Sequence, residues 1–425
     1  MSVRACVFTA LALVWCAPEA RAQAVFTIDE AVQQAIDKNL TLVAERLNLT
    51  VADAAIATAR LRPNPVLSGG ANSLDWLGTG FNETNGAGPQ EYAVRVDVPF
   101  ERGGKRELRT AVASTARSIA EAQLADSVRR LQLDVTIAAV DVLEAKAKLR
   151  LARENLDTLD RLVKLNERRL TSGALPPLEV TRSRVAMLQY RGSVTTAELT
   201  VTQARLKIHA LLGRQAGEPL ADIEDDLRLP PVATAPNLDI VEAAARTNRP
   251  DIRALQRDEA RSQYDLRLQV AQGRVDYTLG AEYRRQQGVN GKGNLAGLFV
   301  SVPLPIFNRN QGEIARAEAE HEKAARSLVA LETSVSSEVA SAYAEFQSTR
   351  DLLTGIEREL LQPAADARAG TAYVYQAGAT SLLDVLDAQR AFNDTMDAYY
   401  TAQAAYRRAE ARLRLVADID PRRQP

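Results

Sequence analysis

The fold is decided by a change of periodicity within EYAVRVDVPFERGGKRELRTAVASTARSIAEAQL, residues 91–124. From Tyr92 to Val98 every second residue is apolar, the pattern of a β-strand with two unlike faces. From Arg102 to Thr171 there is no proline, and apolar residues recur every three or four positions. A helix over 102–171 would be about 105 Å long at 1.5 Å per residue. The sequence therefore predicts a strand joined directly to a helical rod.

The same order of features occurs twice, which predicts a tandem internal repeat. FTIDEA at 26–31 corresponds to LDIVEA at 238–243, and VDVP at 96–99 corresponds to VSVP at 300–303. Gly173 followed by LEV at 178–180 corresponds to Gly378 followed by LDV at 383–385. We expect a first copy over 23–213, a linker over 214–237, a second copy over 238–418 and a tail over 419–425.

Each copy is expected to contain one β-hairpin and one helical hairpin. The predicted strands are 66–77 and 91–100 in the first copy, and 275–287 and 295–304 in the second. The predicted long and return helices are 102–171 and 178–212, then 311–375 and 382–416, with a kink at Pro363. Shorter helices precede the hairpins, over 28–61 with a break near Asn39 and over 240–272 with a break near Pro250.

The first 22 residues have the composition of a secretory signal peptide. Arg4 precedes an apolar run over 5–15, and ARA at 20–22 has the small-x-small form of a cleavage site. The run is shorter than the roughly 20 residues of a spanning helix, which disfavours a membrane anchor. Both cysteines, Cys6 and Cys16, fall in this segment. We predict export, and lipidation of Cys16 stays open.

Charge and composition disfavour several classes of protein. The 53 basic and 54 acidic residues nearly balance, so there is no basic excess to attract nucleic acid. An aromatic content of 5% suits long helices packed through small residues better than several globular units. The two histidines, His209 and His321, stand in no ligand cluster, and no nucleophile-base pair or phosphate loop is present. We therefore expect no enzyme, no cofactor, no metal site and no catalytic residue.

The predicted hairpins of one chain supply too few strands for a closed β-barrel. Four strands cannot close a barrel, and an open strand edge cannot lie in lipid. Strands of about ten residues with alternating faces suit a transmembrane barrel, so closure must come from other copies of the same chain. Three copies would give 12 strands, and the helices would continue the cylinder. The predicted fold is mainly α with a pair of transmembrane β-hairpins. The alternative is a soluble periplasmic coiled-coil adaptor or structural protein, whose hairpins would belong to a compact β domain.

Two motifs carry a resemblance to a known family. YQAG at 375–378 followed by LLDVLDAQ at 382–389 resembles the signature of the TolC family of outer-membrane efflux proteins, and the repeated organisation is similar over essentially the whole chain after the leader. RPNP at 62–65, GGKR at 103–106 and VPLPIFNRNQG at 302–312 most resemble the CzcC-type members, which serve heavy-metal pumps of the resistance-nodulation-division (RND) class.

That resemblance implies an assembly and a task. The expected protein is a homotrimer with a 12-strand β-barrel in the outer membrane and a long α-helical barrel in the periplasm. Its expected partners are outer-membrane lipid, a periplasmic adaptor of the membrane fusion type and an inner-membrane RND pump. It would conduct substrates passively, heavy-metal cations of the cobalt, zinc and cadmium type being favoured over organic compounds.

The resemblance also implies site residues. The helix-to-helix turns form the tip that an adaptor reaches, at Gly173, Ala174, Gly378 and Ala379. The pore and gate are expected at Asp384, Asp387, Glu179 and Tyr375, where rings of carboxylates in a trimer would favour cations. Capping or surface ion pairing is the alternative for the two aspartates. Thr380 stands where the family places an arginine, so the family's closing links cannot be carried over whole.

Overall fold

The computed structural model describes residues 25–78, 90–228, 237–288 and 291–417. They form two compact units. The sheet unit comprises Leu40–Leu133, Ala233–Ser348 and Ala409–Pro425, and the turn unit comprises Met1–Asn39, Asp134–Val232 and Thr349–Arg408. The predicted signal peptide with both cysteines, the predicted tail and residues 229–236 of the predicted linker lie outside the described residues.

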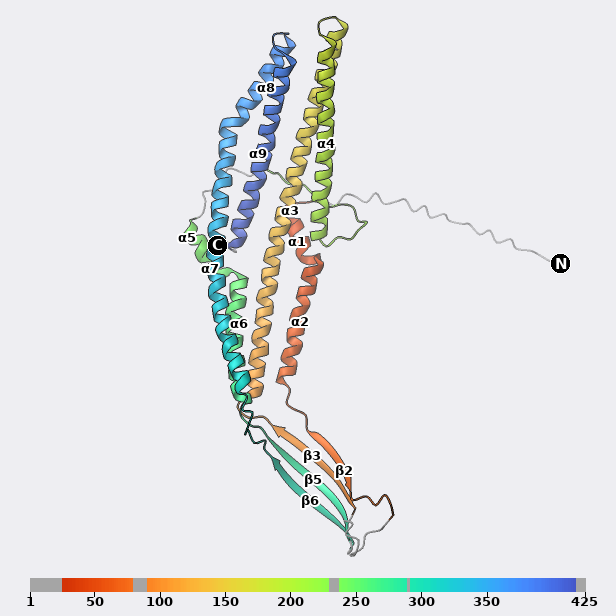
Figure 1. The fold of residues 1–425 in the computed structure, drawn as a ribbon, viewed down its shortest axis with the longest axis vertical. Coiled ribbons are helices and arrows are strands. Elements are labelled where there is room, and N and C mark those ends of the chain that lie inside the picture. Colours follow the sequence, from red (N-terminus) through yellow and green to blue (C-terminus); the bar gives the residue numbers. More distant parts are fainter. Residues whose placement is uncertain (1–24, 79–89, 229–236, 289–290, 418–425) are drawn as a thin grey trace, which may run out of the picture. The chain divides into compact units, whose positions relative to one another are not determined.

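The sheet unit contains one four-stranded antiparallel sheet in the order β2-β3-β5-β6 (Figure 1). Its strands are β2 (Val66–Asn72), β3 (Glu91–Phe100), β5 (Tyr277–Gly288) and β6 (Gly291–Ser301). Its helices are α2 (Leu40–Arg60), α5 (Leu238–Asn248), α6 (Pro250–Gln272), most of α7 (Gln311–Gly355) and the first part of α3 (Lys105–Thr171). The β2 and β6 strands are therefore the two edges of this sheet.

The two faces of the sheet differ in chemistry. Register pairs Val94 with Tyr283, and Ala281 with Leu298, so apolar side chains gather on one face. Leu298 is 89% exposed on this face. The opposite face carries two ion-paired groups, Arg95 with Asp97 at 2.8 Å and Arg284 with Glu282 and Glu91 at 2.8 and 3.4 Å. Because side chains alternate along a strand, the same strands present apolar groups on one side and charges on the other.

The turn unit is made of two helical hairpins and the short pieces beside them. It contains α1 (Ile28–Lys38), α4 (Pro177–Leu211), α8 (Leu361–Gln376), most of α9 (Leu382–Val416), the rest of α3, and the two-residue strands β1 (Val25–Phe26) and β4 (Asp222–Ile223). Arg153 of α3 pairs with Glu198 of α4 at 2.7 Å, and Arg408 of α9 pairs with Asp141 of α3 at 2.9 Å. Helix α3 therefore contacts both α4 and α9.

The end of α4 packs closely on the end of α1. Gly213 has a φ of 67°, and a Cβ placed on it would lie 2.2 Å from the carbonyl oxygen of Lys38. The side-chain amide of Asn39 donates to the carbonyl of Leu211 at 3.0 Å. No residue larger than glycine fits at position 213, because both the conformation and the space exclude a side chain.

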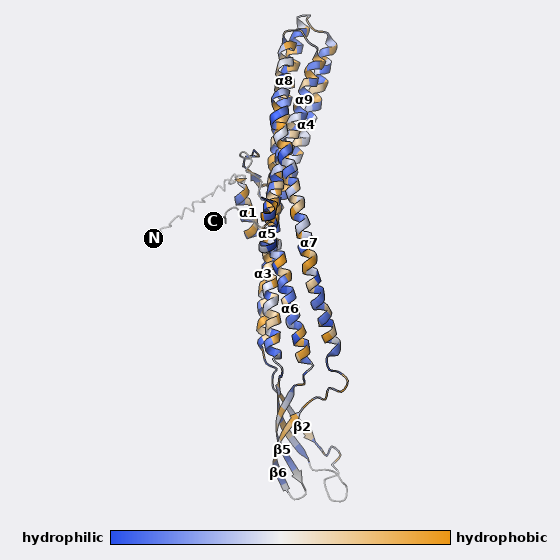
Figure 2. Cartoon of the chain, turned by 90° about the vertical axis from the view of Figure 1, so that its left-hand side faces the viewer, coloured by the Kyte–Doolittle hydropathy of each residue, from blue (hydrophilic) through white to orange (hydrophobic). Residues whose placement is uncertain are grey.

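Hydrophilic and hydrophobic residues are mixed along the labelled helices (Figure 2). Within the described residues, no helix combines the length and the apolar character that crossing a membrane requires.

Several predicted strand and helix bounds are corrected by the structure. The β2 strand ends at Asn72 and not at 77, and Ser73 leaves the strand with a φ of 56°. The β6 strand covers 291–301 and not 295–304, because Pro303 lacks the N–H that a ladder needs. The β5 strand covers 277–288 and not 275–287, and α4 covers 177–211 and not 178–212. Helix α3 begins at Lys105 and not at 102, because Gly103 and Gly104 have φ values of 76° and 71°.

The helix predicted over 311–375 is interrupted earlier than expected. A π-helical turn, η1 (Ile356–Leu360), separates α7 from α8, and the N–H of Leu361 donates to the carbonyl of Ile356. Pro363 follows in the first turn of α8, where its missing N–H is tolerated. The irregularity therefore precedes the proline, because the wider turn accommodates the missing hydrogen bond.

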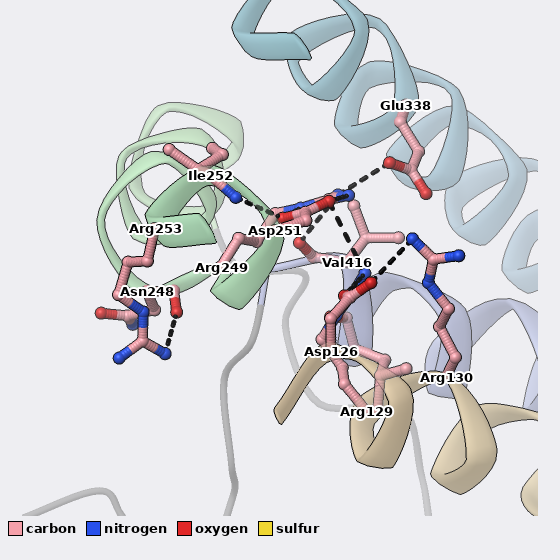
Figure 3. Close-up of polar contacts among 11 residues, drawn as sticks. Asp126, Arg129, Arg130, Asn248, Arg249, Asp251, Ile252, Arg253, Glu338 and Val416 are labelled. Carbon is pink, nitrogen blue, oxygen red and sulfur yellow. Dashed lines mark hydrogen bonds and ion pairs between the residues drawn. The ribbon is translucent and has the colours of Figure 1, made fainter. Parts of the chain in front are cut away.

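The sheet unit also contains a buried group of charges at the break between α5 and α6 (Figure 3). Arg249 donates to both carboxylate oxygens of Asp251, at 3.1 and 2.6 Å, and to Glu338 of α7 at 2.7 Å. It also reaches the carbonyl of Val416, in the last turn of α9, at 3.5 Å. Only 4% of the Arg249 side chain is exposed. One guanidinium thus connects three helices.

A second arginine completes this group. Arg129 of α3 donates to Asp126 at 2.7 and 2.9 Å and to the carbonyl of Leu415 at 3.2 Å, and lies 3.9 Å from Asp251. Burial alone would raise the pKa of Asp251, but the hydrogen bonds and charge of Arg249, with the charge of Arg129, bring that pKa below its ordinary value. The ionised carboxylate is therefore stabilised in the folded chain.

Replacing Arg249 by methionine should destabilise the sheet unit strongly. The change leaves Asp251 buried without its main partner, and breaking a buried pair costs about 3–5 kcal/mol. The measurement is the thermal unfolding midpoint in detergent, with Arg326→Met as the matched control, since Arg326 forms an exposed pair with Glu322 worth below about 1 kcal/mol.

The loss of stability caused by Arg249→Met should depend on pH. The folded pKa of Asp251 is depressed, so its contribution is present above about pH 4 and is lost as the pH falls through the folded value. Equal midpoints for the two variants at pH 7 would contradict a stabilising role for Arg249.

Candidate functional site at the helix-to-helix turns

The two helix-to-helix turns have the same backbone geometry. After α3, the N–H of Gly173 donates to Leu170 and that of Ala174 to Arg169, at 3.0 and 2.8 Å. After α8, the N–H of Gly378 donates to Tyr375 and that of Ala379 to Val374, at 2.9 and 3.1 Å. This is the Schellman pattern, in which the glycine adopts a positive φ, here 74° and 77°. Nothing lies within 4 Å of a Cβ placed at either glycine. The positive φ, and not a lack of space, therefore explains why glycine occupies both positions.

These turns are accessible surfaces. Gly173, Ala174, Gly378 and Ala379 are all exposed. The turns are therefore available to a partner, although no partner chain is needed to explain their glycines.

A buried polar link joins α3 and α8 next to the second turn. The hydroxyl of Tyr375 donates to the side-chain oxygen of Asn166 at 2.9 Å, and both residues are buried. Arg169 donates to the carbonyls of Tyr375 and Gln376 at 3.2 and 2.6 Å, and its guanidinium lies 5.3 Å from the Tyr375 ring centre. The end of α8 is thereby held to α3.

The environment raises the pKa of the Tyr375 hydroxyl. Burial raises the pKa of its hydroxyl, and the hydrogen bond to Asn166 only partly offsets this effect. The charge of Glu179 also raises that pKa, so the structure brings these two predicted site residues near one another. A tyrosine is already neutral at physiological pH, and the raised pKa keeps the Tyr375 hydroxyl a hydrogen-bond donor at still higher pH.

Asn166 and Arg169 were missed in the sequence because each is one polar residue among many on a long helix. A second polar link, also missed, lies further along the same helices. Gln389 of α9 donates to Asn155 of α3 and to Asn393, at 3.1 and 2.9 Å, and Asn393 donates to the hydroxyl of Tyr190 in α4 at 2.7 Å. This chain of amides connects three helices through side chains that only the fold brings together.

Asp384 takes part in a helix cap. Its carboxylate accepts from the hydroxyl of Thr380 at 2.6 Å and from the hydroxyl and N–H of Ser381 at 2.7 and 3.1 Å, while Ser381 accepts from the N–H of Asp384 at 3.2 Å. This reciprocal arrangement is a capping box at the start of α9. The hydroxyl of Thr380, then those groups of Ser381, lower the pKa of Asp384. Capping, the alternative left open for this residue, thus accounts for its contacts within one copy.

Asp387 and Glu179 make weaker contacts. Asp387 is 60% exposed and lies 3.6 Å from Arg390, one turn further along α9. Glu179, in the first turn of α4, lies 3.5 Å from Arg182. Of the predicted acidic residues, Asp387 is therefore the one whose charge is least engaged by its own chain.

One hydrogen-bond contact is found for each histidine in the described chain. His209 lies 3.1 Å from the carbonyl of Gln215, and His321 lies 3.0 Å from the hydroxyl of Ser262. Across the described residues no three His, Cys, Asp or Glu side chains come together in a way that could hold a metal ion.

Comparison with known proteins identifies the class to which this architecture belongs. The profile of the family described as outer membrane efflux protein matches residues 31–214 and again residues 242–417, and the chain is a member of that family. The family resemblance predicted from the sequence is thereby confirmed, and the family is one of efflux proteins rather than enzymes.

Individual proteins are similar to this chain over most of their length. The cobalt-zinc-cadmium resistance protein CzcC of Cupriavidus metallidurans is 27% identical over 364 residues, which cover 86% of this chain and 83% of CzcC. The pyoverdine export outer membrane protein OpmQ of Pseudomonas aeruginosa is 25% identical over 400 residues, covering 87% and 80%. The crystal structure of CusC superposes with a TM-score of 0.75 at 19% identity over 92% of each chain, which establishes a shared TolC-like fold.

Replacing Tyr375 by phenylalanine should loosen the link between α3 and α8. The change leaves the buried Asn166 side chain without its partner, at a cost of about 1–3 kcal/mol. Hydrogen exchange of amides in 160–180 and 370–390 should accelerate, while exchange in α1 stays unchanged. Tyr373→Phe is the matched control, since Tyr373 is 75% exposed on the same helix. Equal exchange in the two variants would show that the hydroxyl contributes nothing to the turn unit.

Proposed function

We propose that this chain is the exit duct of a tripartite efflux system of the RND type. In this proposal three copies form a 12-strand β-barrel in the outer membrane, continued by a long α-helical barrel in the periplasm. A periplasmic adaptor and an inner-membrane pump supply the substrate and the energy, and the duct conducts passively. The observation that carries the proposal is the two-faced sheet with two open edges.

The faces of the sheet support a membrane location. In an outer-membrane barrel, outward side chains meet lipid and inward side chains meet water. The face with Val94, Tyr283 and Leu298 suits lipid, and the face with Arg95 and Arg284 suits an aqueous lumen. A compact soluble domain would instead bury the apolar face, and exposed Leu298 argues against that alternative.

The edges of the sheet support closure with other copies of the chain. The β2 and β6 strands each have one side without a strand partner within the described chain. Lipid offers no hydrogen-bond partners, so β6 of one copy must pair with β2 of the next. Four strands from each of three copies make the proposed 12.

The helices support a duct that extends away from the membrane. Helix α3 has 67 residues and is about 100 Å long. The order of two helices, two strands and a helical hairpin occurs in each half, and the family profile matches each half, so we propose a tandem repeat over 23–213 and 238–418. A signal peptide over 1–22 would direct export.

The turns supply the proposed tip and gate. The exposed residues Gly173, Ala174, Gly378 and Ala379 form the adaptor-docking tip. Tyr375 with Asn166 and the nearby Glu179 would hold the resting state, in place of links that an arginine at Thr380 would make. Asp384 and Asp387 would each repeat three times around the axis, and Asp387 carries the freer charge.

Heavy-metal cations of the cobalt, zinc and cadmium type are the proposed substrates. CzcC is named for resistance to these metals and is similar over most of both chains. A ring of Asp387 carboxylates favours cations electrostatically without retaining them. Export of an organic compound is the competing possibility, since OpmQ is named for pyoverdine export.

The trimer is tested by disulfide cross-linking between edge strands. The described chain has no cysteine, so Leu67→Cys on β2 can be combined with Leu298→Cys or Val300→Cys on β6. These positions share the apolar face, and bonding requires Cβ atoms about 3.5–4.5 Å apart. Oxidation in isolated outer membranes should give a ladder that ends at three copies on denaturing gels.

Ser68→Cys in place of Leu67→Cys is the matched control for cross-linking. Its side chain lies on the opposite face, beside Arg95, and should not reach either partner. A ladder that ends at two copies, or a protein that leaves membranes without detergent, would overturn the proposed barrel.

The substrate is tested by removing the gene from its host. Tolerance to at least one of cobalt, zinc and cadmium salts should fall several-fold and return with the wild-type copy. An Asp387→Asn copy should restore tolerance only partly, because the carboxylate ring is lost. Asp157→Asn, at an exposed pair with Arg161 on α3, should restore it fully. Loss of tolerance to organic compounds alone would overturn the metal proposal, and full rescue by Asp387→Asn would remove that residue from the pore.

A further inference from the structure

The segment that follows β6 exposes large apolar side chains. Between Ser301 and Gln311 the chain reads VPLPIFNRN, residues 302–310, which we call the junction loop. Leu304, Ile306 and Phe307 are exposed by 77%, 64% and 90%. Three such side chains within four residues are more than an isolated surface residue and indicate an interaction surface.

The junction loop borders a cavity with positive charge. The cavity has a volume of about 310 Å³ and is lined by Lys105, Arg274, Asp276 and Arg309, among others. Lys105 is neutralised, since its amino group donates to Asp276 and to the carbonyl of Arg274, each at 2.8 Å. Neither Arg274 nor Arg309 forms an ion pair with a carboxylate in the described part of the chain. Two guanidinium charges are therefore uncompensated beside the apolar loop.

The position of Arg309 is set by the backbone around it. Its Nε donates to the carbonyl of Pro305 at 3.2 Å, within the junction loop. A Cβ on Gly273 would lie 2.8 Å from the carbonyl oxygen of Arg309, so the loop closes tightly on the segment that carries Arg274. All of these residues belong to the sheet unit.

We propose that the cavity binds the phosphate headgroup of an anionic phospholipid, and that Leu304, Ile306 and Phe307 enter the acyl layer beside it. The inference rests on the proposed function, in which the strands cross the membrane. The loop begins where β6 ends, so it lies at the depth where a membrane changes from acyl chains to headgroups. Arginine suits this place because its stem packs on apolar groups while its planar head binds phosphate oxygens with two donors.

The lipid that fits is one from the leaflet on the helical side of the sheet. The loop connects β6 to α7, so it belongs to the end of the sheet from which the helices continue. A headgroup with net negative charge is preferred over a zwitterionic one, because the two uncompensated guanidinium groups attract it electrostatically. A second copy of this chain covering the loop is the competing occupant.

The test uses tryptophan fluorescence in vesicles. Trp76 is replaced by phenylalanine, and F307W serves as the reporter in the mature full-length protein. Vesicles contain phosphatidylcholine and phosphatidylglycerol at a fixed ratio, and an equal mole fraction of either lipid carries brominated acyl chains. Brominated phosphatidylglycerol should quench the reporter about twofold more than brominated phosphatidylcholine. In the R274Q/R309Q background the ratio should fall to about one while quenching persists.

A reporter on the strand separates this inference from the proposed function. L298W lies on the apolar face of β6 and should be quenched by both lipids alike. If L298W is not quenched, the membrane location of the sheet fails. If L298W is quenched and F307W is not, a second copy covers the loop and only the lipid site is overturned. Equal quenching of F307W by both lipids without the arginine changes would also overturn the headgroup site.

Discussion

The backbone hydrogen-bonding groups along the outer edges of β2 and β6 are the constraint on which the rest of the structure depends. Every other strand edge of the described sheet is paired. The alternation of apolar and charged faces suits the sheet to a boundary between lipid and water, where unpaired backbone groups are least tolerated. Under the proposed assembly a single chain therefore supplies one third of the barrel. The edges of its sheet are paired only when the other two copies are present.

Polar contacts specify how the helices of the turn unit meet. Many of its buried residues are alanines, which allow close approach but distinguish poorly between one alignment and another. The hydrogen bond of Tyr375 to Asn166 and the chain from Gln389 to Tyr190 each require one particular alignment of the helices that carry them. Buried hydrogen bonds of this kind contribute little net stability yet penalise every other arrangement. Under the proposed function, a gate composed of such contacts would change state by exchanging hydrogen-bond partners rather than by unfolding.

Much of the fold was predictable from local pattern, and much of the site was not. Alternation around Val94 and the absence of proline after Arg102 are properties of neighbouring residues, so they indicated strand and helix directly. Family membership followed from YQAG and the residues after it. Asn166 is separated from Tyr375 by 209 positions, and Arg249 from Glu338 by 89 positions. No local sequence pattern can therefore predict these contacts. Asp384 could cap or line a pore, and only the hydroxyl positions of Thr380 and Ser381 distinguish these roles within one copy.

The π-helical turn at Ile356–Leu360 gives the second helical hairpin a property that the first lacks. A π turn holds one residue more than an α turn, and each residue of an α-helix advances its direction by about 100°. The π-helical turn therefore changes the direction in which the side chains of α8 point around the helix axis. The hydrogen bond of Tyr375 to Asn166 depends on that rotation, so the number of residues in this short segment helps to determine which side of α8 faces α3.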